Sequence, residues 1–223
     1  MVERPEVVIH IGQVYATREP TIIKTVLGSC IAACLFDPVA RIGGMNHFML
    51  PAPEVPTAHD PEISRFGVHA MDLLIGALQR AGGERGRLQA KVFGGGHVLR
   101  IAVNGNSVPE RNIRFIEKFL QTERITVVSR DLGGYLPRRI QFQTDTGRVL
   151  VKRLGQQTVR QTRAEEKEHL QEIGQVSRRF GPTTLFEDEE PTTMRAPRVD
   201  MSRTDLSLRA RTHSAIGGFR STD

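Results

Sequence analysis

Residues 21–38 read TIIKTVLGSCIAACLFDP and contain two runs of strand-forming residues on either side of Gly28-Ser29-Cys30. Thr21–Val26 is rich in β-branched residues, which favour extended chain. Ile31–Phe36 is apolar throughout, as expected for a buried strand, and a short buried helix has the same pattern. Asp37-Pro38 then ends the run with a turn signal. The stretch therefore predicts two strands with a short connection between them.

The rest of the first 154 residues mixes strand and helix patterns. Further strands are predicted at Val7–Ile11, Leu88–Phe93, Ile125–Val128, Arg138–Gln143 and Val149–Lys152. The last two of these form a predicted hairpin around Thr144–Gly147. Gly43-Gly44 is predicted to break the chain ahead of Met45–Leu50.

Two helices are predicted between these strands. From Phe66 to Arg80, apolar residues recur at spacings of three and four until Gly82-Gly83 ends the pattern. A second helix begins after Ser107, because Ser107 and Glu110 form the residue pair of a capping box. Residues 1–154 are therefore predicted to form one folded domain.

The sequence changes character at residue 155. Of the 223 residues only 39% are hydrophobic and 5% aromatic, so part of the chain is expected to lie outside the core. Residues 155–223 are polar and charge-balanced, and they bury too little apolar area to offset the entropy of ordering them. Ala164–Gln175 could form a short charged helix. We predict that residues 155–223 are a mostly disordered tail and that the core folds and acts without it.

Several features point to the cytoplasm. Cys30 and Cys34 are too few for a disulfide framework and fit a reducing compartment. No apolar run approaches the roughly 18 residues that a membrane span needs, and the N-terminus lacks a signal-peptide pattern, so no membrane insertion is expected. The net charge of +6 comes from residues 1–154, but no nucleic-acid-binding motif accompanies it.

Cys30 is the first candidate for chemistry. It directly follows Gly28 and Ser29, where backbone N–H groups can point at a bound oxyanion, and Gly28 permits the torsion angles that such a turn needs. A thiol in this position can be a nucleophile. It can equally be a buried apolar group, which is the usual state of a free cysteine. The residues alone leave both interpretations open.

His47 is the candidate base among seven histidines. It interrupts an apolar run beside Asn46, and a buried imidazole must have a partner or a function. Two neighbouring strands joined by a turn through Asp37–Gly44 would bring His47 close to Cys30. A thiolate–imidazolium pair would lower the pKa of the thiol and hold a base ready for proton transfer.

Other kinds of site are less favoured by the spacing. Cys30 and Cys34 would lie about 13 Å apart on a strand, too far for a disulfide. A zinc site built from these cysteines and two histidines lacks any tight Cys-x-x-Cys or His-x-x-x-His pair. Gly94–Gly96, followed by His97, lacks the phosphate-loop pattern, so a tight turn beside the active site explains it better. No metal or cofactor is expected.

A set of separated motifs occurs in one order along residues 6–154. They are Thr25-x-Leu27-Gly28-Ser29-Cys30, Asp37-Pro38, Gly43–Pro51, Arg65-Phe66-Gly67, Lys91–Gly95, Arg111-Asn112, Asp131–Gly134 and Arg138-Arg139. This set resembles the bacterial CheD family of chemoreceptor glutamine deamidases. The resemblance is specific because several distant motifs agree, and it does not extend into the tail.

The resemblance implies an α+β fold, a single domain of helices packed on two β-sheets and related to the cytotoxic necrotizing factor toxins. It implies that Cys30 is the nucleophile and His47 its base. The family also uses a threonine just upstream of the nucleophile, for which Thr25 is the best match and Thr21 a rival. We expect backbone amides around Gly28 and Ser29 to hold the oxyanion.

The implied activity is deamidation of glutamine to glutamate on methyl-accepting chemotaxis receptors through a cysteine thioester. The same chemistry could hydrolyse a glutamate methyl ester. The implied partners are the receptors and a CheC-type phosphatase. The alternatives are a non-catalytic module that binds CheC or a receptor, and an unrelated cysteine peptidase, although no papain-like flank surrounds Cys30.

Overall fold

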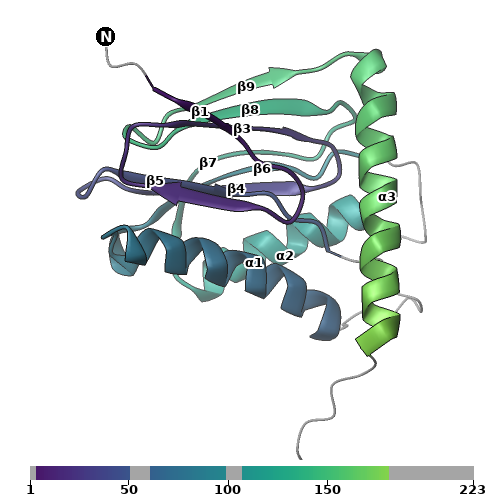
Figure 1. Cartoon of the computed structure of the whole chain (residues 1–223), viewed down its shortest axis with the longest axis horizontal. Coiled ribbons are helices and arrows are strands. Elements are labelled where there is room, and N and C mark those ends of the chain that lie inside the picture. The colour runs from purple at the N-terminus through teal and green to yellow at the C-terminus, as the bar shows by residue number, and fades with distance from the viewer. Residues whose placement is uncertain (1–3, 51–60, 99–106, 181–223) are drawn as a thin grey trace, which may run out of the picture. The chain divides into compact units, whose positions relative to one another are not determined.

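A computed structural model describes residues 4–50, 61–98 and 107–180 (Figure 1). The strands are β1 (Glu6–Val8), β2 (Val14–Thr17), β3 (Ile22–Leu27), β4 (Ile31–Asp37), β5 (Ile42–Asn46), β6 (Gln89–Gly94), β7 (Thr126–Leu132), β8 (Arg138–Gln143) and β9 (Val149–Arg153). The helices are α1 (Pro61–Arg80), α2 (Val108–Thr122) and α3 (Gln156–Phe180), with a short 3-10 helix at Arg85–Arg87. The expected α+β fold is confirmed, whereas the relation to the necrotizing factor toxins stays a prediction.

The strands form two sheets. One has the order β1-β3-β8-β9 and the other the order β2-β5-β4-β6-β7. The pairs β1–β3 and β6–β7 are parallel, and the remaining pairs are antiparallel. Figure 1 shows the sheets stacked on each other, with α1 and α2 on the outer face of the five-stranded sheet. The domain therefore has three layers, with one core between the sheets and another beneath the helices.

Strand β4 lies at the centre of the five-stranded sheet and is covered on both faces. Ile31, Ala33 and Leu35 pack into the core beneath the helices. Ala32 and Cys34 alternate with them and pack into the core between the sheets, where Cys30 also lies. Because successive side chains of a strand point to opposite faces, two apolar layers produce the continuous apolar run seen in the sequence.

The strands and helices predicted in the first 154 residues are present, with small differences at their ends. The predicted hairpin is confirmed, since β8 and β9 pair directly. The predicted break at Gly43-Gly44 is wrong, because both residues lie inside β5. A Cβ on Gly43 would lie 2.6 Å from the Thr144 carbonyl oxygen, and one on Gly44 would lie 2.6 Å from Ala16. These glycines therefore allow close packing, and β2, which carries Ala16, was not predicted.

Asp37 organises the turn between β4 and β5. Its carboxylate accepts the backbone N–H groups of Val39 and Ala40 at 2.9 and 3.0 Å. It also forms an ion pair with Arg87, which holds the pKa of Asp37 well below its usual value despite the opposing effect of burial. The predicted turn between two adjacent strands is thus confirmed.

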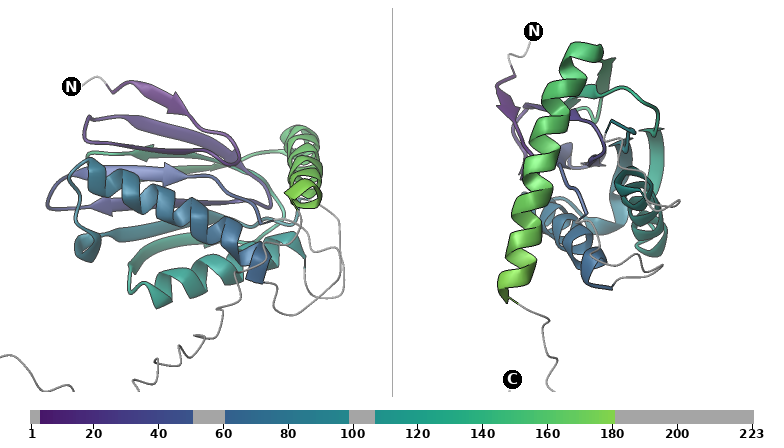
Figure 2. Two further views of the ribbon diagram at one scale, coloured as in Figure 1. Left: turned by 60° about the horizontal axis from the view of Figure 1, so that its bottom comes forward. Right: turned by 90° about the vertical axis from the view of Figure 1, so that its right-hand side faces the viewer.

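Helix α3 lies within the segment from residue 155 that was predicted to be mostly disordered. Residues 156–180 form one helix, longer than the short charged helix considered at Ala164–Gln175. Figure 2 shows α3 crossing one end of the two sheets. Its inward positions are polar, with Thr162 and Glu166 buried, so the apolar stripe that predicts packing is missing. Residues 181–223 lie outside the described part of the chain.

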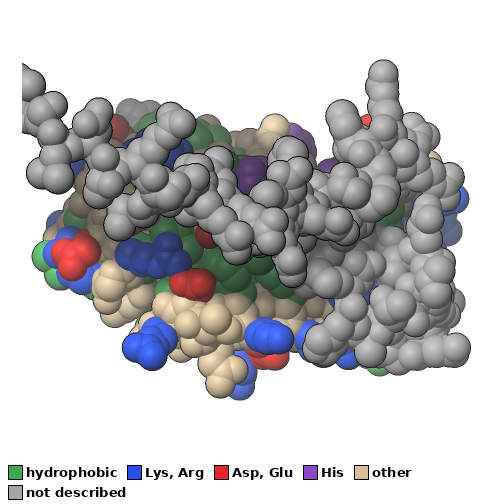
Figure 3. All heavy atoms as spheres, turned by 90° about the horizontal axis from the view of Figure 1, so that it is seen from below, with side chains coloured by type: hydrophobic (Ala, Val, Ile, Leu, Met, Phe, Trp, Pro, Cys, Tyr) green, Lys and Arg blue, Asp and Glu red, His purple; other side chains and the backbone are tan. Residues whose placement is uncertain are grey.

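The outer surface of α1 and α2 carries mixed charge. In Figure 3, Lys and Arg side chains on this face are interspersed with acidic and apolar ones. Among the described residues, no helix combines the length and apolar character that crossing a membrane requires.

Candidate active site

The connection Gly28-Ser29-Cys30 joins the two sheets. Strand β3 ends at Leu27 in the four-stranded sheet, and β4 begins at Ile31 in the five-stranded one. All three carbonyl oxygens of the connection have donors from elsewhere in the chain. These donors are Gly96 N on Gly28 O at 2.7 Å, Asn112 Nδ2 on Ser29 O at 2.8 Å, and Gly95 N on Cys30 O at 2.8 Å. Three hydrogen bonds thereby hold the backbone of the connection in place.

The glycine run after β6 is the predicted tight turn beside this connection. Gly94 and Gly95 have φ angles of 115° and 64°, in the left-handed region that favours glycine. A Cβ on Gly94 would lie 2.0 Å from the Cys30 carbonyl oxygen. The glycine run therefore packs directly against the backbone carbonyl of Cys30.

Gly28 is required for space and not for an unusual torsion angle, contrary to the prediction. Its φ is outside the left-handed region. A Cβ at this position would lie 2.5 Å from Val98 Cγ2, 2.7 Å from Glu166 Oε1 and 2.9 Å from Thr162 Cγ2. The absence of a side chain at Gly28 thus leaves room for Val98 and for Thr162 and Glu166 of α3.

The hydrogen bonds of Thr25 define the tautomer of His47. The Thr25 hydroxyl donates its one proton to the Ile9 carbonyl at 2.8 Å, so it must act as acceptor towards His47 Nδ1, also at 2.8 Å. Nδ1 therefore carries the hydrogen, and Nε2 carries a free lone pair. Nε2 is buried without a hydrogen-bond partner in the described part of the chain. This is the state of a histidine that can accept a proton.

Cys30 and His47 lie on the same face of the five-stranded sheet. Ile31 pairs with Phe48 in an antiparallel bridge, which sets Cys30 diagonally from His47. The side chain of Cys30 packs between the sheets with Met45 and Met49, the residues two positions on either side of His47. The predicted proximity of Cys30 and His47 follows from this register.

The predicted thiolate–imidazolium pair is not what the structure contains. Burial raises the pKa of the Cys30 thiol well above its usual value, and the Glu166 carboxylate raises it further. Burial lowers the pKa of His47 to about 3, with smaller contributions from His169 and His10. Both side chains are therefore neutral near pH 7.

A carboxylate occupies the position expected for the oxyanion. Glu166 Oε1 accepts the backbone N–H of Ser29 at 2.7 Å and that of Cys30 at 3.2 Å. Glu166 Oε2 accepts the Ser29 hydroxyl at 2.6 Å. Burial raises the pKa of Glu166, although these hydrogen bonds act in the opposite direction. The connection therefore binds a carboxyl group through two backbone amides and one hydroxyl, directly at Cys30.

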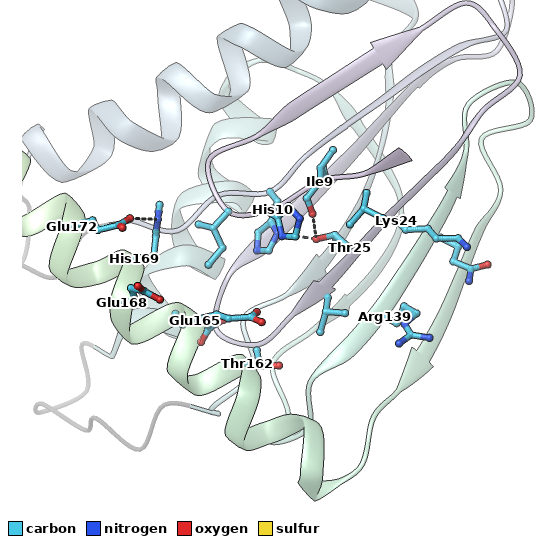
Figure 4. A pocket seen from close by; sticks show the side chains of 16 residues that line it. Ile9, His10, Lys24, Thr25, Arg139, Thr162, Glu165, Glu168, His169 and Glu172 are labelled. Carbon is cyan, nitrogen blue, oxygen red and sulfur yellow. Dashed lines mark hydrogen bonds and ion pairs between the residues drawn. The ribbon is translucent and has the colours of Figure 1, made fainter. Parts of the chain in front are cut away.

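A cleft of about 690 Å³ lies next to this carboxyl group, between the four-stranded sheet and α3. Thr25, His47 and Glu166 contribute to its lining, whereas Cys30 does not. Figure 4 shows the Thr25–Ile9 hydrogen bond on one wall, with α3 on the other. Glu166 therefore both lines the cleft and accepts the backbone N–H of the buried Cys30.

The structure brings together all five residues predicted for the site, namely Thr25, Gly28, Ser29, Cys30 and His47. The rival Thr21 lies elsewhere, with its backbone N–H on the Thr144 hydroxyl at 2.9 Å. Cys34 is buried and unpaired between the sheets. In the described ranges, no three His, Cys, Asp or Glu side chains converge as a metal site would require.

Two contributors were not predicted as site residues. Asn112 was known only as part of a motif, and in the structure it links Ser29 O to Leu50 N through its side-chain amide. Glu166 stood within the predicted tail. Its only sequence signal is a weak one, a Thr, Glu and Leu at helical spacing among charged residues.

Comparisons with known proteins show which family the chain resembles. The family described as CheD chemotactic sensory transduction matches residues 49–153. "Probable chemoreceptor glutamine deamidase CheD 1" of Shewanella oneidensis is 48% identical over 157 residues, covering 68% of this chain and 74% of the relative. The protein of the same name from Burkholderia thailandensis is 49% identical over 144 residues, covering 64% of this chain. This chain spans 61% of the length of that relative.

Proposed function

Because the chain belongs to the CheD family, we propose that it deamidates glutamine side chains of chemoreceptors, releasing ammonia and leaving glutamate. The proposal assigns Cys30 as nucleophile, His47 as general base and acid, and Thr25 as the residue that orients His47. The observation that carries it is the carboxyl-binding connection, in which the N–H groups of Ser29 and Cys30 converge beside the thiol.

The first half of the reaction forms a thioester. With the substrate carboxamide at the connection, His47 Nε2 takes the proton of the Cys30 thiol as sulfur attacks the amide carbon. The carbonyl oxygen becomes an oxyanion held by the Ser29 and Cys30 N–H groups, and such donors are worth roughly 3–4 kcal/mol each in other enzymes. His47 then returns the proton to nitrogen, the C–N bond breaks, and ammonia leaves.

The second half consumes one water molecule. His47 Nε2 takes a proton from water, whose oxygen attacks the thioester carbon. The C–S bond breaks, the sulfur regains a proton from His47, and the product is a glutamate side chain. The same steps release methanol from a glutamate methyl ester, so peptides carrying that ester belong in the assay.

Thr25 keeps His47 in the tautomer that this cycle needs. Because its hydroxyl accepts the Nδ1 hydrogen, it leaves Nε2 unprotonated. Two free, unpaired cysteines in the described chain fit the reducing cytoplasm, where we propose that the reaction takes place.

The test compares the two cysteines. Cytoplasmic receptor fragments are incubated with wild type, Cys30→Ala, Cys30→Ser and the matched control Cys34→Ala. Conversion is read by peptide mass spectrometry and by released ammonia. We expect Cys34→Ala to keep its activity and both Cys30 variants to lose nearly all of theirs, with a Cys30→Ala/His47→Ala double variant little worse than either single one. Wild-type turnover in folded Cys30→Ala would refute the mechanism.

The same experiment addresses the binding-module alternative. We propose a CheC-type phosphatase as a partner on the strength of the family resemblance alone. Receptor or phosphatase binding by a wild-type protein that shows no turnover would favour the module that binds without catalysis.

A further inference from the structure

Helix α3 packs on the domain through a polar stripe. Thr162 and Glu166 are buried, and His169 and Leu170 are half-buried. Their spacing places them on one face of the helix. An amphipathic helix usually buries an apolar stripe, whereas this one buries a carboxyl group at the centre of its interface. The feature to be explained is therefore why a glutamate side chain lies against Cys30.

Glu166 has the contacts that a reaction product would have. Deamidation of glutamine leaves a glutamate side chain whose carboxyl oxygens remain close to the groups that held the oxyanion. Glu166 is a glutamate, and its Oε1 accepts both backbone N–H groups of the connection. Its carboxylate also acts on the Cys30 thiol directly, because it raises the pKa of that thiol.

The attachment of α3 is light enough to be reversible. Only Leu154 and Gly155 connect it to β9, and within the described chain no strand or helix packs extensively against it. Besides Glu166, its contacts include the Arg163 hydrogen bond to the Val98 carbonyl at 3.0 Å and the half-buried Leu170. Burying a carboxylate is costly, and the hydrogen bonds from Ser29 and Cys30 offset that cost only while Glu166 is seated. A competing side chain that satisfies the same donors can therefore replace it.

The charges around the cleft fit an acidic helix. Figure 4 shows Glu165 and Glu168 on α3, across the cleft from Lys24 of β3 and Arg139 of β8. Opposite charges across an interface favour the correct partner and the correct orientation. The groove that α3 fills thus selects a helix with acidic residues beside the side chain that enters the site.

We propose that α3 is an intramolecular occupant of the substrate groove, which closes the active site with Glu166 in the product position until a substrate helix displaces it. This proposal rests on the function proposed above. While α3 is seated, Cys30 is buried and no external carboxamide reaches it. Turnover then requires α3 to leave the connection.

The test uses thiol alkylation, which does not depend on the proposed reaction. Full-length wild type, Glu166→Ala, Thr162→Lys and the control Lys167→Ala are treated with iodoacetamide, and labelling of each cysteine is read by peptide mass mapping. Lys167 is the exposed neighbour of Glu166 and lies outside the cleft lining. Thr162→Lys is expected to displace α3 from the connection without changing Glu166, because Thr162 packs against Gly28 and a lysine side chain is larger.

We expect labelling of Cys30 to rise about tenfold or more in Glu166→Ala and Thr162→Lys, since each loses contacts that seat the helix. Lys167→Ala should behave as wild type. Cys34 serves as an internal control, because it stays buried between the sheets while the domain is folded. Unchanged labelling of Cys30 in both variants would overturn the proposal. Equal labelling of both cysteines would also overturn it, by showing that α3 is part of the core.

Deamidation of receptor fragments by the same variants separates the two proposals. Faster deamidation together with faster Cys30 labelling supports both. Faster labelling of Cys30 with no deamidation by any variant supports the proposal that α3 occupies the substrate groove, and it refutes the proposed function. Unchanged labelling with full wild-type deamidation refutes the occupant and leaves the function standing.

Discussion

The Thr25 hydroxyl lies 2.8 Å from His47 Nδ1 while donating its own proton to the Ile9 carbonyl. A hydroxyl has a single proton, so these two contacts together leave the Nδ1 hydrogen on histidine and the lone pair on Nε2. Thr25 of β3 and Ile9, which follows β1, therefore decide the tautomer of His47, which follows β5.

Replacing Thr25 tests this relationship. Thr25→Val keeps the shape but removes the acceptor, so kcat should fall by at least about tenfold and by no more than the roughly 10²–10⁴ that a general base supplies. Thr25→Ser should retain most of the activity. Thr21→Val, in the same strand region but bonded to Thr144 and Glu19, is the matched control and should leave kcat near wild type. Equal kcat in Thr25→Val and wild type would contradict the assignment.

Asn112 should contribute both to stability and to catalysis. Asn112→Ala leaves the Leu50 N–H and the Ser29 carbonyl without their partner, at about 1–3 kcal/mol for a buried group left unsatisfied. Urea unfolding measures this loss, and kcat should fall because Ser29 is no longer anchored. Thr144→Val, a buried change distant from the connection, should lower stability without lowering kcat. A loss of kcat in both variants would contradict the prediction, because it would show that kcat falls with stability in general and not with the anchoring of Ser29 by Asn112.

His47 should make the fold sensitive to acid. Its pKa is about 3 in the folded chain and has a usual value of 6.5. Between these values the unfolded chain binds a proton that the folded chain does not, so stability is complete above pH 6.5 and falls as the pH is lowered towards 3. His169 acts in the same direction, because burial also lowers its pKa.

The measurement is the free energy of unfolding in urea at about pH 7 and about pH 5, where one such group contributes at most about 1.4 kcal/mol per pH unit. His47→Gln should show a smaller difference between the two conditions than wild type. If the variant and wild type lose stability equally, His47 is not the group responsible.

A substitution in α3 should turn the helix into a substrate. In Glu166→Gln a carboxamide enters the position of the carboxyl group, next to Cys30. We expect the introduced glutamine to be converted to glutamate in the purified chain, with release of ammonia. Gln161 and Gln171, which are exposed on the same helix, are internal controls and should remain amides.

Addition of Cys30→Ala to Glu166→Gln should abolish this conversion. Peptide mass spectrometry over time resolves the three glutamine positions. Conversion at Gln161 or Gln171 at the same rate would indicate spontaneous hydrolysis, and would argue against a site-directed reaction.

Local patterns were sufficient for most of the fold. The continuous apolar run Ile31–Phe36, the capping pair Ser107 and Glu110, and the turn residues near Asp37 each depend on neighbours in sequence, and each predicted its element. The register that sets Cys30 beside His47 was also accessible, because one short turn joins their strands. Resemblance to a family then singled out Cys30, whose buried thiol has no distinctive local pattern.

The sequence by itself thus determined most of the strands and the first two helices, and it predicted that Cys30 and His47 lie close together. Only the tertiary structure decided the place of α3 and the role of Glu166. The reason is physical: α3 packs through hydrogen bonds to Ser29 and Cys30, more than 130 residues away in sequence, and not through an apolar stripe. Helical periodicity detects apolar faces, so a helix that packs mainly through polar contacts is predicted as a solvated segment when the sequence alone is considered.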